Sequence, residues 1–404
     1  MRFLTEICLL TSLLGSLSLS AHAQEKNTVP PKQEAIRADK SKSNPAPDIK
    51  LEALWDGRKM APFKALDNPK MVPMLEADYL NDSDYVLGLT LNGESRAYPT
   101  RFLWWHHIIN DSIGKAESGG QVPIAVTYCS VCNTGICYDP TLDGKALKID
   151  FYGLYNGVVV LCERETESVV LQVEGRFVTG ALAGKQLAPK PTLDTTWGKW
   201  KLLHPNTLVM SPTPESQRWY SPKDQPEPRG YDRFPAPFFR PTVTRGDKRL
   251  PPFDKVLAVT VVQPQKKKSE PERVIRRAYP IKALQEANGV LNDKVGKVSM
   301  TVFLDTETVT ANAFSSVLDG KTLTFEARKQ EDGKFAFYDK ETESRWNIEG
   351  LAEEGALAGK SLARIENHLS QWYGWSAYFP DTSIYGRKDP PQPGNPFENP
   401  AEKP

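Results

Sequence analysis

The chain has 404 residues, and its 51 basic and 50 acidic side chains leave a net charge of only +1 at pH 7. This balance excludes a broad positive surface for nucleic acid or for anionic membranes. Hydrophobic residues make up 39% of the chain, which is enough for ordinary cores, and five cysteines are too few for a disulfide-built scaffold. The length predicts two domains.

The N-terminal segment has the pattern of a secretory signal peptide. A positively charged start precedes an apolar run over residues 7–19, and Ala-His-Ala ends at residue 23. The run is shorter than the ~20 residues of a membrane helix. We therefore expect cleavage after Ala23, a periplasmic or secreted protein without a membrane span, and an envelope component as one possibility. Residues 24–50 are polar and proline-rich, which predicts a disordered linker.

Six motifs occur twice in the same order, with nearly constant spacing between the two copies. They are RAYP at 96–99 and 277–280, Asn-Asp at 110–111 and 292–293, LDGK at 142–145 and 318–321, ETES at 165–168 and 341–344, GALAGK at 180–185 and 355–360, and Trp-x-x-Trp from Trp197 and from Trp372. A collinear series of this kind indicates internal duplication. The boundaries we expect are a first repeat at 51–211, a Pro- and aromatic-rich linker at 212–250, a degenerate second repeat at 251–386 and a flexible tail at 387–404.

The elements predicted in each repeat are mostly strands. Alternating β-branched residues predict strands at 85–91 and 255–261. A short helix is expected at 102–109, a buried strand at 123–128, and tight turns at Asp-Gly 143–144 and 319–320. Each Trp-x-x-Trp segment is expected to form a closing helix. The predicted fold is mainly β (β-rich α+β), with two copies of one domain packed together.

The two repeats differ in their cysteine and histidine content, and this difference points to a site in the first repeat. Cys129 and Cys132 have no cysteine counterpart in the second repeat, and His204 corresponds to Phe379. Cys-x-x-Cys after a strand has the spacing of a metal knuckle, with His106, His107 or His204 available to complete it. Two thiolates and an imidazole suit zinc, and the same soft set suits copper(I).

Other functions for these residues remain open. Cys129 and Cys132 could form a redox-active dithiol, an electron-transfer pair or a structural disulfide. Cys137 could be a further ligand or a disulfide partner, whereas Cys162 corresponds to Tyr338 and is expected to fill a strand position. A third hypothesis is a non-catalytic module that binds glycans or peptides of the envelope. Its groove would be lined by Trp104, Trp105, Trp197 and Trp200.

The motifs of the chain resemble a known bacterial family. The series RAYP, WHHIIND, VPIAVTYCSVCNTG, LDGK, EGRFVTGALAGKQL, TTWGKW and HPNT is similar to the family catalogued as domain of unknown function 3179. The second repeat looks like the degenerate half of such proteins. The resemblance implies that the site residues are His106, Cys129, Cys132 and His204, and it implies no reaction and no catalytic residue.

From these observations we expect an exported protein that binds zinc or copper in its first repeat and has no nucleotide cofactor. His106 and the two thiols are expected to converge within bonding distance of one metal ion.

Overall fold

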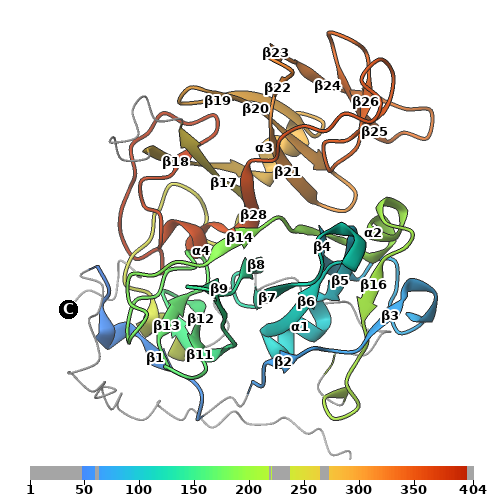
Figure 1. The fold of residues 1–404 in the computed structure, drawn as a ribbon. Coiled ribbons are helices and arrows are strands. Elements are labelled where there is room, and N and C mark those ends of the chain that lie inside the picture. The colour runs from blue at the N-terminus through green and yellow to red at the C-terminus, as the bar shows by residue number, and fades with distance from the viewer. Residues whose placement is uncertain (1–47, 60–62, 218–219, 221–236, 264–272, 398–404) are drawn as a thin grey trace, which may run out of the picture. The chain divides into compact units, whose positions relative to one another are not determined.

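Figure 1 shows the fold in a computed structural model, which describes residues 48–59, 63–217, 220, 237–263 and 273–397. The predicted signal peptide at 1–23 and nearly all of the predicted linker at 24–50 lie outside these ranges. Within them, no helix combines the length and the apolar character needed to cross a bilayer.

The strands of the first half form three sheets and one short hairpin, counted over the described residues. Their bounds are β1 Trp55–Asp56, β2 Leu66–Asp67, β3 Met71–Pro73, β4 Tyr85–Leu91, β5 Glu94–Pro99, β6 Ile108–Ile113, β7 Val122–Cys129, β8 Thr134–Asp139, β9 Thr141–Leu142, β10 Lys145–Ala146, β11 Ile149–Tyr155, β12 Val158–Glu163, β13 Val169–Leu171, β14 Ala188–Lys190, β15 Leu193–Thr196 and β16 Leu208–Met210. The sheet orders are β15-β4-β5-β16-β3, β14-β8-β7-β6-β2 and β1-β11-β12-β13, and β9 pairs with β10.

The second half repeats this pattern with fewer strands. Its strands are β17 Lys255–Gln263, β18 Arg273–Pro280, β19 Val290–Val295, β20 Val298–Asp305, β21 Thr310–Ser315, β22 Val317–Leu318, β23 Lys321–Thr322, β24 Phe325–Lys329, β25 Phe335–Asp339, β26 Arg345–Trp346, β27 Ala352–Glu354, β28 Glu366–Gln371 and β29 Ser383–Ile384. The order β28-β17-β18-β29 matches β15-β4-β5-β16, and β19-β20-β21 matches β6-β7-β8. The expected mainly β fold is confirmed.

The helices are short and stand at corresponding places in the two halves. They are α1 Thr100–His106, α2 Trp197–Leu203, α3 Ile281–Glu286 and α4 Trp372–Ser376, with 3-10 turns at Leu51–Ala53, Met74–Glu76, Ala116–Ser118 and Pro237–Thr242. The first helix ends earlier than the predicted 102–109. His107 has a φ of 60°, which is incompatible with a continuing helix, and β6 begins at the next residue.

The repeated motifs make the same contacts in both halves. In the first half, the Tyr98 hydroxyl and the Arg96 guanidinium donate to Asp111 at 2.7 and 2.6 Å. In the second half, Tyr279 donates to Asp293 at 2.7 Å. These side chains therefore recur because they tie strand β5 to β6 and strand β18 to β19.

The predicted Asp-Gly turns are also present. Asp143 and Asp319 each have a φ of 49°, and the glycines that follow have φ values of 80° and 77°. These positive angles are the ones that two-residue hairpins need. They join β9 to β10 and β22 to β23.

The two halves share their hydrophobic cores along a contact that we call the seam. The first core joins Val158 of the first half to Trp372 of the second, and another joins Trp200 to Phe303. Strand β28 contacts β8, and β15 contacts β21. Both pairs are linked by hydroxyl hydrogen bonds, from Thr134 to Ser370 at 2.8 Å and from Thr310 to Thr195 at 2.7 Å.

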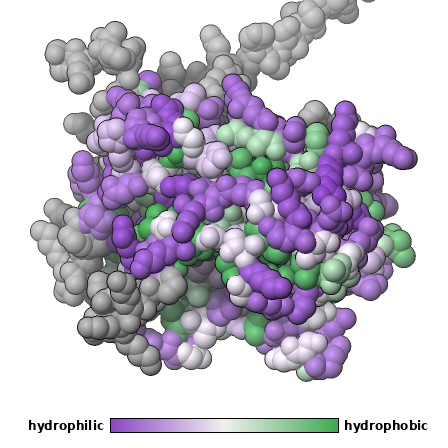
Figure 2. All heavy atoms as spheres, turned by 90° about the horizontal axis from the view of Figure 1, so that it is seen from above, coloured by the Kyte–Doolittle hydropathy of each residue, from purple (hydrophilic) through white to green (hydrophobic). Residues whose placement is uncertain are grey.

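Figure 2 shows the face at the top of Figure 1, where hydrophilic side chains predominate and apolar ones lie scattered between them. Among the described large apolar residues, Leu75 and Leu202 are the most exposed, at 88% and 82%. Isolated residues of this kind are normal on a soluble surface.

Candidate functional site

Cys129 and Cys132 lie side by side at the end of β7 and in the turn that leads to β8. Both side chains are 0% exposed. The Sγ atom of Cys129 accepts the backbone N–H groups of Cys132 and Val159, each at 3.4 Å. The Cys132 sulfur lies 3.3 Å from the Thr134 hydroxyl. The Cys129 sulfur thus accepts one N–H group from its own turn and one from β12.

These surroundings push the pKa values of the two thiols in opposite directions. Burial by itself raises the pKa of Cys129, but the Cys132 thiol and the N–H groups of Val159, Cys132 and Val131 hold it below its usual value. Burial raises the pKa of Cys132 well above its usual value, and the neighbouring Cys129 raises it further. The geometry therefore favours one thiolate, on Cys129.

The second half has an anion at the position of Cys129. Cys129 pairs with Thr134 across its hairpin, and Asp305 pairs with Thr310 in the same place of the second half. The Asp305 carboxylate accepts the backbone N–H groups of Glu307 and Thr308 at 3.1 and 3.2 Å. This turn directs backbone N–H groups at an acceptor atom in both halves, an oxygen in one and a sulfur in the other.

The residue that faces this turn across the seam differs between the halves. Lys199 of α2 lies across the seam, 2.9 Å from Asp305. Its counterpart in α4 is Gly374, which lies against Cys132. A Cβ at Gly374 would come within 2.7 Å of the Cys132 Cβ. The Gln371 N–H also donates to the Cys132 carbonyl at 3.0 Å. The described residues of the second half therefore cover Cys132, and at the position that matches Lys199 they place a glycine.

His106 lies at the end of α1 and uses both ring nitrogens in other contacts. Nδ1 is 2.8 Å from the Lys64 carbonyl oxygen, and Nε2 is 2.7 Å from the Tyr220 hydroxyl. Burial lowers the pKa of His106, although the Lys64 carbonyl opposes this. The side chain is therefore a buried, hydrogen-bonded histidine.

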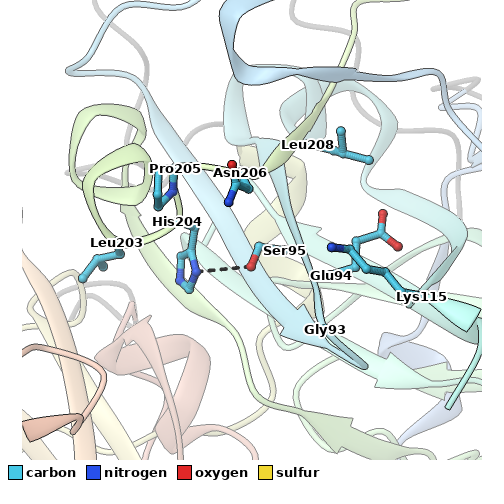
Figure 3. Close-up of a pocket in the computed structure, with 9 residues that line it drawn as sticks. All are labelled: Gly93, Glu94, Ser95, Lys115, Leu203, His204, Pro205, Asn206 and Leu208. Carbon is cyan, nitrogen blue, oxygen red and sulfur yellow. Dashed lines mark hydrogen bonds between the residues drawn. The ribbon is translucent and has the colours of Figure 1, made fainter. Parts of the chain in front are cut away.

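His204 ends α2 and lies in a different part of the first half. Its Nδ1 is 3.2 Å from the Ser95 hydroxyl, and its Nε2 is 3.1 and 3.0 Å from the two carboxylate oxygens of Glu349, which comes from the second half. Figure 3 shows Ser95 and His204 pointing toward each other at the wall of a cavity of about 530 Å³. The imidazole thus lies between a hydroxyl and a carboxylate.

The structure brings together Cys129 and Cys132 and separates them from the two expected histidine ligands. Over the described ranges, no three or more His, Cys, Asp or Glu side chains are placed to hold a metal ion. The expected convergence of His106 with the thiols is not seen, because its ring nitrogens are occupied by Lys64 and Tyr220. Metal binding itself stays a prediction.

The remaining sequence candidates lie in the cores. Trp197 and Trp200 are buried, so they do not line a surface groove, and Trp104 and Trp105 are half-buried. The Cys137 and Cys162 thiols each lie 3.9 Å from a backbone carbonyl. Burial raises the pKa of Cys162 to about 12. These two thiols are neutral core side chains.

Sequence reasoning missed Ser95 and Glu349. Ser95 directly precedes RAYP, and the residue before the second RAYP is Arg276. The comparison that singled out His204 would have found this difference as well. Glu349 occurs in both halves, with Glu174 as its counterpart, so no difference marks it. Its contact with His204 crosses the seam and is visible only in the fold.

His107 is buried beside Phe63 and Phe151, and this predicts sensitivity to acid. Burial lowers the pKa of His107 from 6.5 to about 4. Between these values the unfolded chain binds a proton that the folded chain does not, so stability falls as pH drops through this window. We expect a loss of about 2 kcal/mol at pH 5 relative to pH 7.5 from this residue.

The variant His107→Asn tests this, because Asn tolerates a positive φ and does not titrate in this range. Its urea midpoint should fall less between pH 7.5 and pH 5 than that of the wild type. Equal falls in the two proteins would contradict the prediction.

The fold and the site define a class: a mainly β chain whose halves share cores and differ in their reactive side chains. A family model described as "Protein of unknown function (DUF3179)" matches residues 62–382. The chain belongs to this family, as the motifs predicted. No curated protein and no solved structure matches the chain.

Proposed function

We propose that this protein binds one copper(I) ion through Cys129 and Cys132. The observation that carries the proposal is the position of Cys129, which corresponds to Asp305 and receives backbone N–H groups in the same turn. Such donors stabilise a negative charge. A thiolate at this position is a soft metal ligand, and Cys132 provides a second sulfur beside it.

The charge balance at the seam supports a bound cation. Asp305 of the second half is neutralised by the ammonium of Lys199, which comes from the first half and lies 2.9 Å away. The counterpart of Lys199 beside the thiol pair is Gly374, which has no side chain to do so. A buried and unpaired negative charge is costly. Copper(I) held by both thiolates would offset one of their two negative charges.

The number of ligands favours copper(I) over zinc. Zinc sites in proteins generally use four ligands, of which at least three come from side chains. The described part of the chain offers no group of three such side chains. Copper(I) prefers soft thiolates and is satisfied by two of them. The proposed site is therefore a two-sulfur site.

The residues that pack over Cys129 and Cys132 determine how fast the proposed site exchanges its copper ion. Cys132 is packed against Gly374 and hydrogen-bonded to Gln371. Entry and release of copper need local opening at α4 and the end of β28, so we propose slow exchange and a holding role. The signal peptide that the sequence predicts at residues 1–23 supports a role outside the cytoplasm.

The test is a copper(I) titration of the reduced mature protein without oxygen, against a chromophoric copper(I) chelator. We expect one copper per chain, and we expect Cys129→Ser and Cys132→Ser to weaken binding on the order of 100-fold or more. Cys137→Ser and Cys162→Ser are matched controls, because both change a buried thiol and should keep the copper.

Thermal unfolding of Cys129→Ser and Cys132→Ser separates metal loss from misfolding. A variant that unfolds cooperatively and binds no copper has lost the ligand and not the fold. No binding by the wild type would overturn the proposal. Loss of copper in Cys162→Ser with retention in Cys129→Ser would do the same.

A second candidate function is thiol–disulfide exchange, which the direct contact of the two thiols supports. In this reaction the two thiols lose two protons and two electrons to an external disulfide, which becomes two thiols. Alkylation of the freshly isolated, denatured protein separates the candidates. Four reactive cysteines in the mature chain fit the copper site, whereas two protected ones, identified as Cys129 and Cys132 by mass spectrometry, fit the disulfide.

A further inference from the structure

We infer that Ser95, His204 and Glu349 form a catalytic site that hydrolyses carboxylic esters. The inference is independent of the proposed copper site, because it rests on other residues at a different place. His204 lies 3.2 Å from the Ser95 hydroxyl and 3.0 Å from Glu349. A nucleophile, a base within hydrogen-bond reach and a group that orients the base define covalent catalysis of acyl transfer.

The hydrogen bonds give each group a role. With a proton on Nε2 donated to the Glu349 carboxylate, Nδ1 of His204 has a lone pair for the Ser95 O–H. Glu349 then holds the imidazole in this orientation and stabilises the positive charge that develops on it. Either ring nitrogen can act as the base when the other is the donor.

Access distinguishes this site from the buried thiols. Ser95 and His204 border the cavity of about 530 Å³, and the side chains of His204 and Glu349 are 15% and 30% exposed. That volume accommodates a small or medium-sized ligand. Figure 3 shows Lys115 reaching along the same cavity toward Ser95. The other charged residue of the wall, Glu94, is neutralised by Arg96 at 2.7 Å.

The second half shows that the fold does not need these side chains. Phe379 takes the place of His204, and its ring lies 4.3 Å from Trp375, as the His204 ring lies 4.0 Å from Trp200. Arg276 takes the place of Ser95, with its guanidinium 4.0 Å from the Phe379 ring. The same scaffold therefore holds a base and a hydroxyl in one half and a cation over an aromatic ring in the other.

The proposed reaction has two steps that balance. Ser95 Oγ attacks the ester carbonyl as Nδ1 of His204 takes its proton, and the bond to the alcohol breaks as His204 gives that proton to the leaving alkoxide. Water then attacks the acyl–Ser95 ester, and His204 transfers the water proton to Ser95 Oγ. The net reaction is ester plus water to acid plus alcohol. Lys115 brings a positive charge toward the negative charge that develops on the carbonyl oxygen.

The experiment measures hydrolysis of p-nitrophenyl acetate and butyrate by the full mature protein, with a chelator present so that no metal contributes. We expect turnover by the wild type and a loss of about 1,000-fold in kcat/KM for Ser95→Ala and for His204→Phe. Glu349→Gln should lose on the order of 10- to 100-fold. Ser112→Ala, at another half-buried serine, is the control and should retain the activity.

Two further measurements make the result specific. The double variant Ser95→Ala/His204→Phe should be no slower than either single variant, because residues that act as a unit are not additive. A fluorophosphonate ester should label Ser95, as located by mass spectrometry, and labelling should disappear in His204→Phe. His204→Phe should also fold, since Phe379 occupies the matching position.

Three outcomes would overturn the inference. They are the absence of both turnover and labelling in the wild type, labelling at another residue, and full activity in Ser95→Ala. Failure here leaves the copper titration untouched, because Cys129 and Cys132 take no part in the reaction.

Discussion

Expressed without the second half, residues 24–217 are expected to aggregate or to show no cooperative unfolding transition. Two of the hydrophobic cores contain residues from both halves, so the fragment exposes the apolar surface that Trp372 and Phe303 cover in the full chain. It also loses buried hydrogen bonds, such as that from the Tyr378 hydroxyl to the Tyr155 carbonyl at 2.7 Å. The free energy of unfolding of a protein is only roughly 5–15 kcal/mol, so the loss of these contacts is enough to unfold the fragment.

Size-exclusion chromatography and thermal unfolding followed by circular dichroism would check this expectation. Coexpression of residues 24–217 with residues 237–397 as separate chains is the control, because it restores the shared cores without the covalent connection. A soluble, monomeric fragment with a sharp unfolding transition would contradict the prediction.

The second large effect concerns the buried ion pair of the first half. Asp111 binds the Arg96 guanidinium at 2.6 Å and the Tyr98 hydroxyl at 2.7 Å, and the two charged side chains are only 6% and 8% exposed. Asp111→Ala removes one of the two carboxylates that pair with the buried guanidinium, which keeps Glu94 at 2.7 Å, and it leaves the Tyr98 hydroxyl without its acceptor. We expect a loss of about 3 kcal/mol in the free energy of unfolding.

The second half provides the matched variant. Asp293 makes the same contact with Arg277 at 2.7 Å, but these side chains are 14% and 25% exposed. Water can therefore solvate the guanidinium that Asp293→Ala leaves behind, and we expect a loss of about 1–2 kcal/mol. Denaturant unfolding of both variants would decide the point. If Asp293→Ala lost as much free energy of unfolding as Asp111→Ala, or more, burial of the ion pair would not determine the size of the loss.

Much of the fold could be predicted because it depends on local patterns. The alternating strands at 85–91 and 255–261 and the Asp-Gly turns are properties of a few neighbouring residues, and each is present. The end of α1 was missed because a positive φ at His107 depends on its contacts with Tyr128 and the surrounding rings. Tertiary packing overrides local preference at such points.

The candidate site was harder to predict than the fold. Comparison of the repeats finds residues that one repeat lacks, but it does not tell which of them meet. His106 and His204 are both absent from the second repeat, yet one is a core histidine beside Tyr220 and the other lies on a cavity. Glu349 contacts His204 and Gly374 contacts Cys132, and both belong to the second half. The motif spacing of the first half therefore does not reveal these contacts.

The hydroxyl contacts of the seam have a consequence for the history of the chain. Thr134 with Ser370 and Thr310 with Thr195 are the same contact made twice, with the halves exchanged. This is the isologous geometry of a C2 homodimer, here joined into one polypeptide. In a true homodimer, a change on one side of the interface appears on both. Only the fused chain can keep Cys132 against Gly374 on one side and Asp305 against Lys199 on the other, and so carry one thiol pair per molecule.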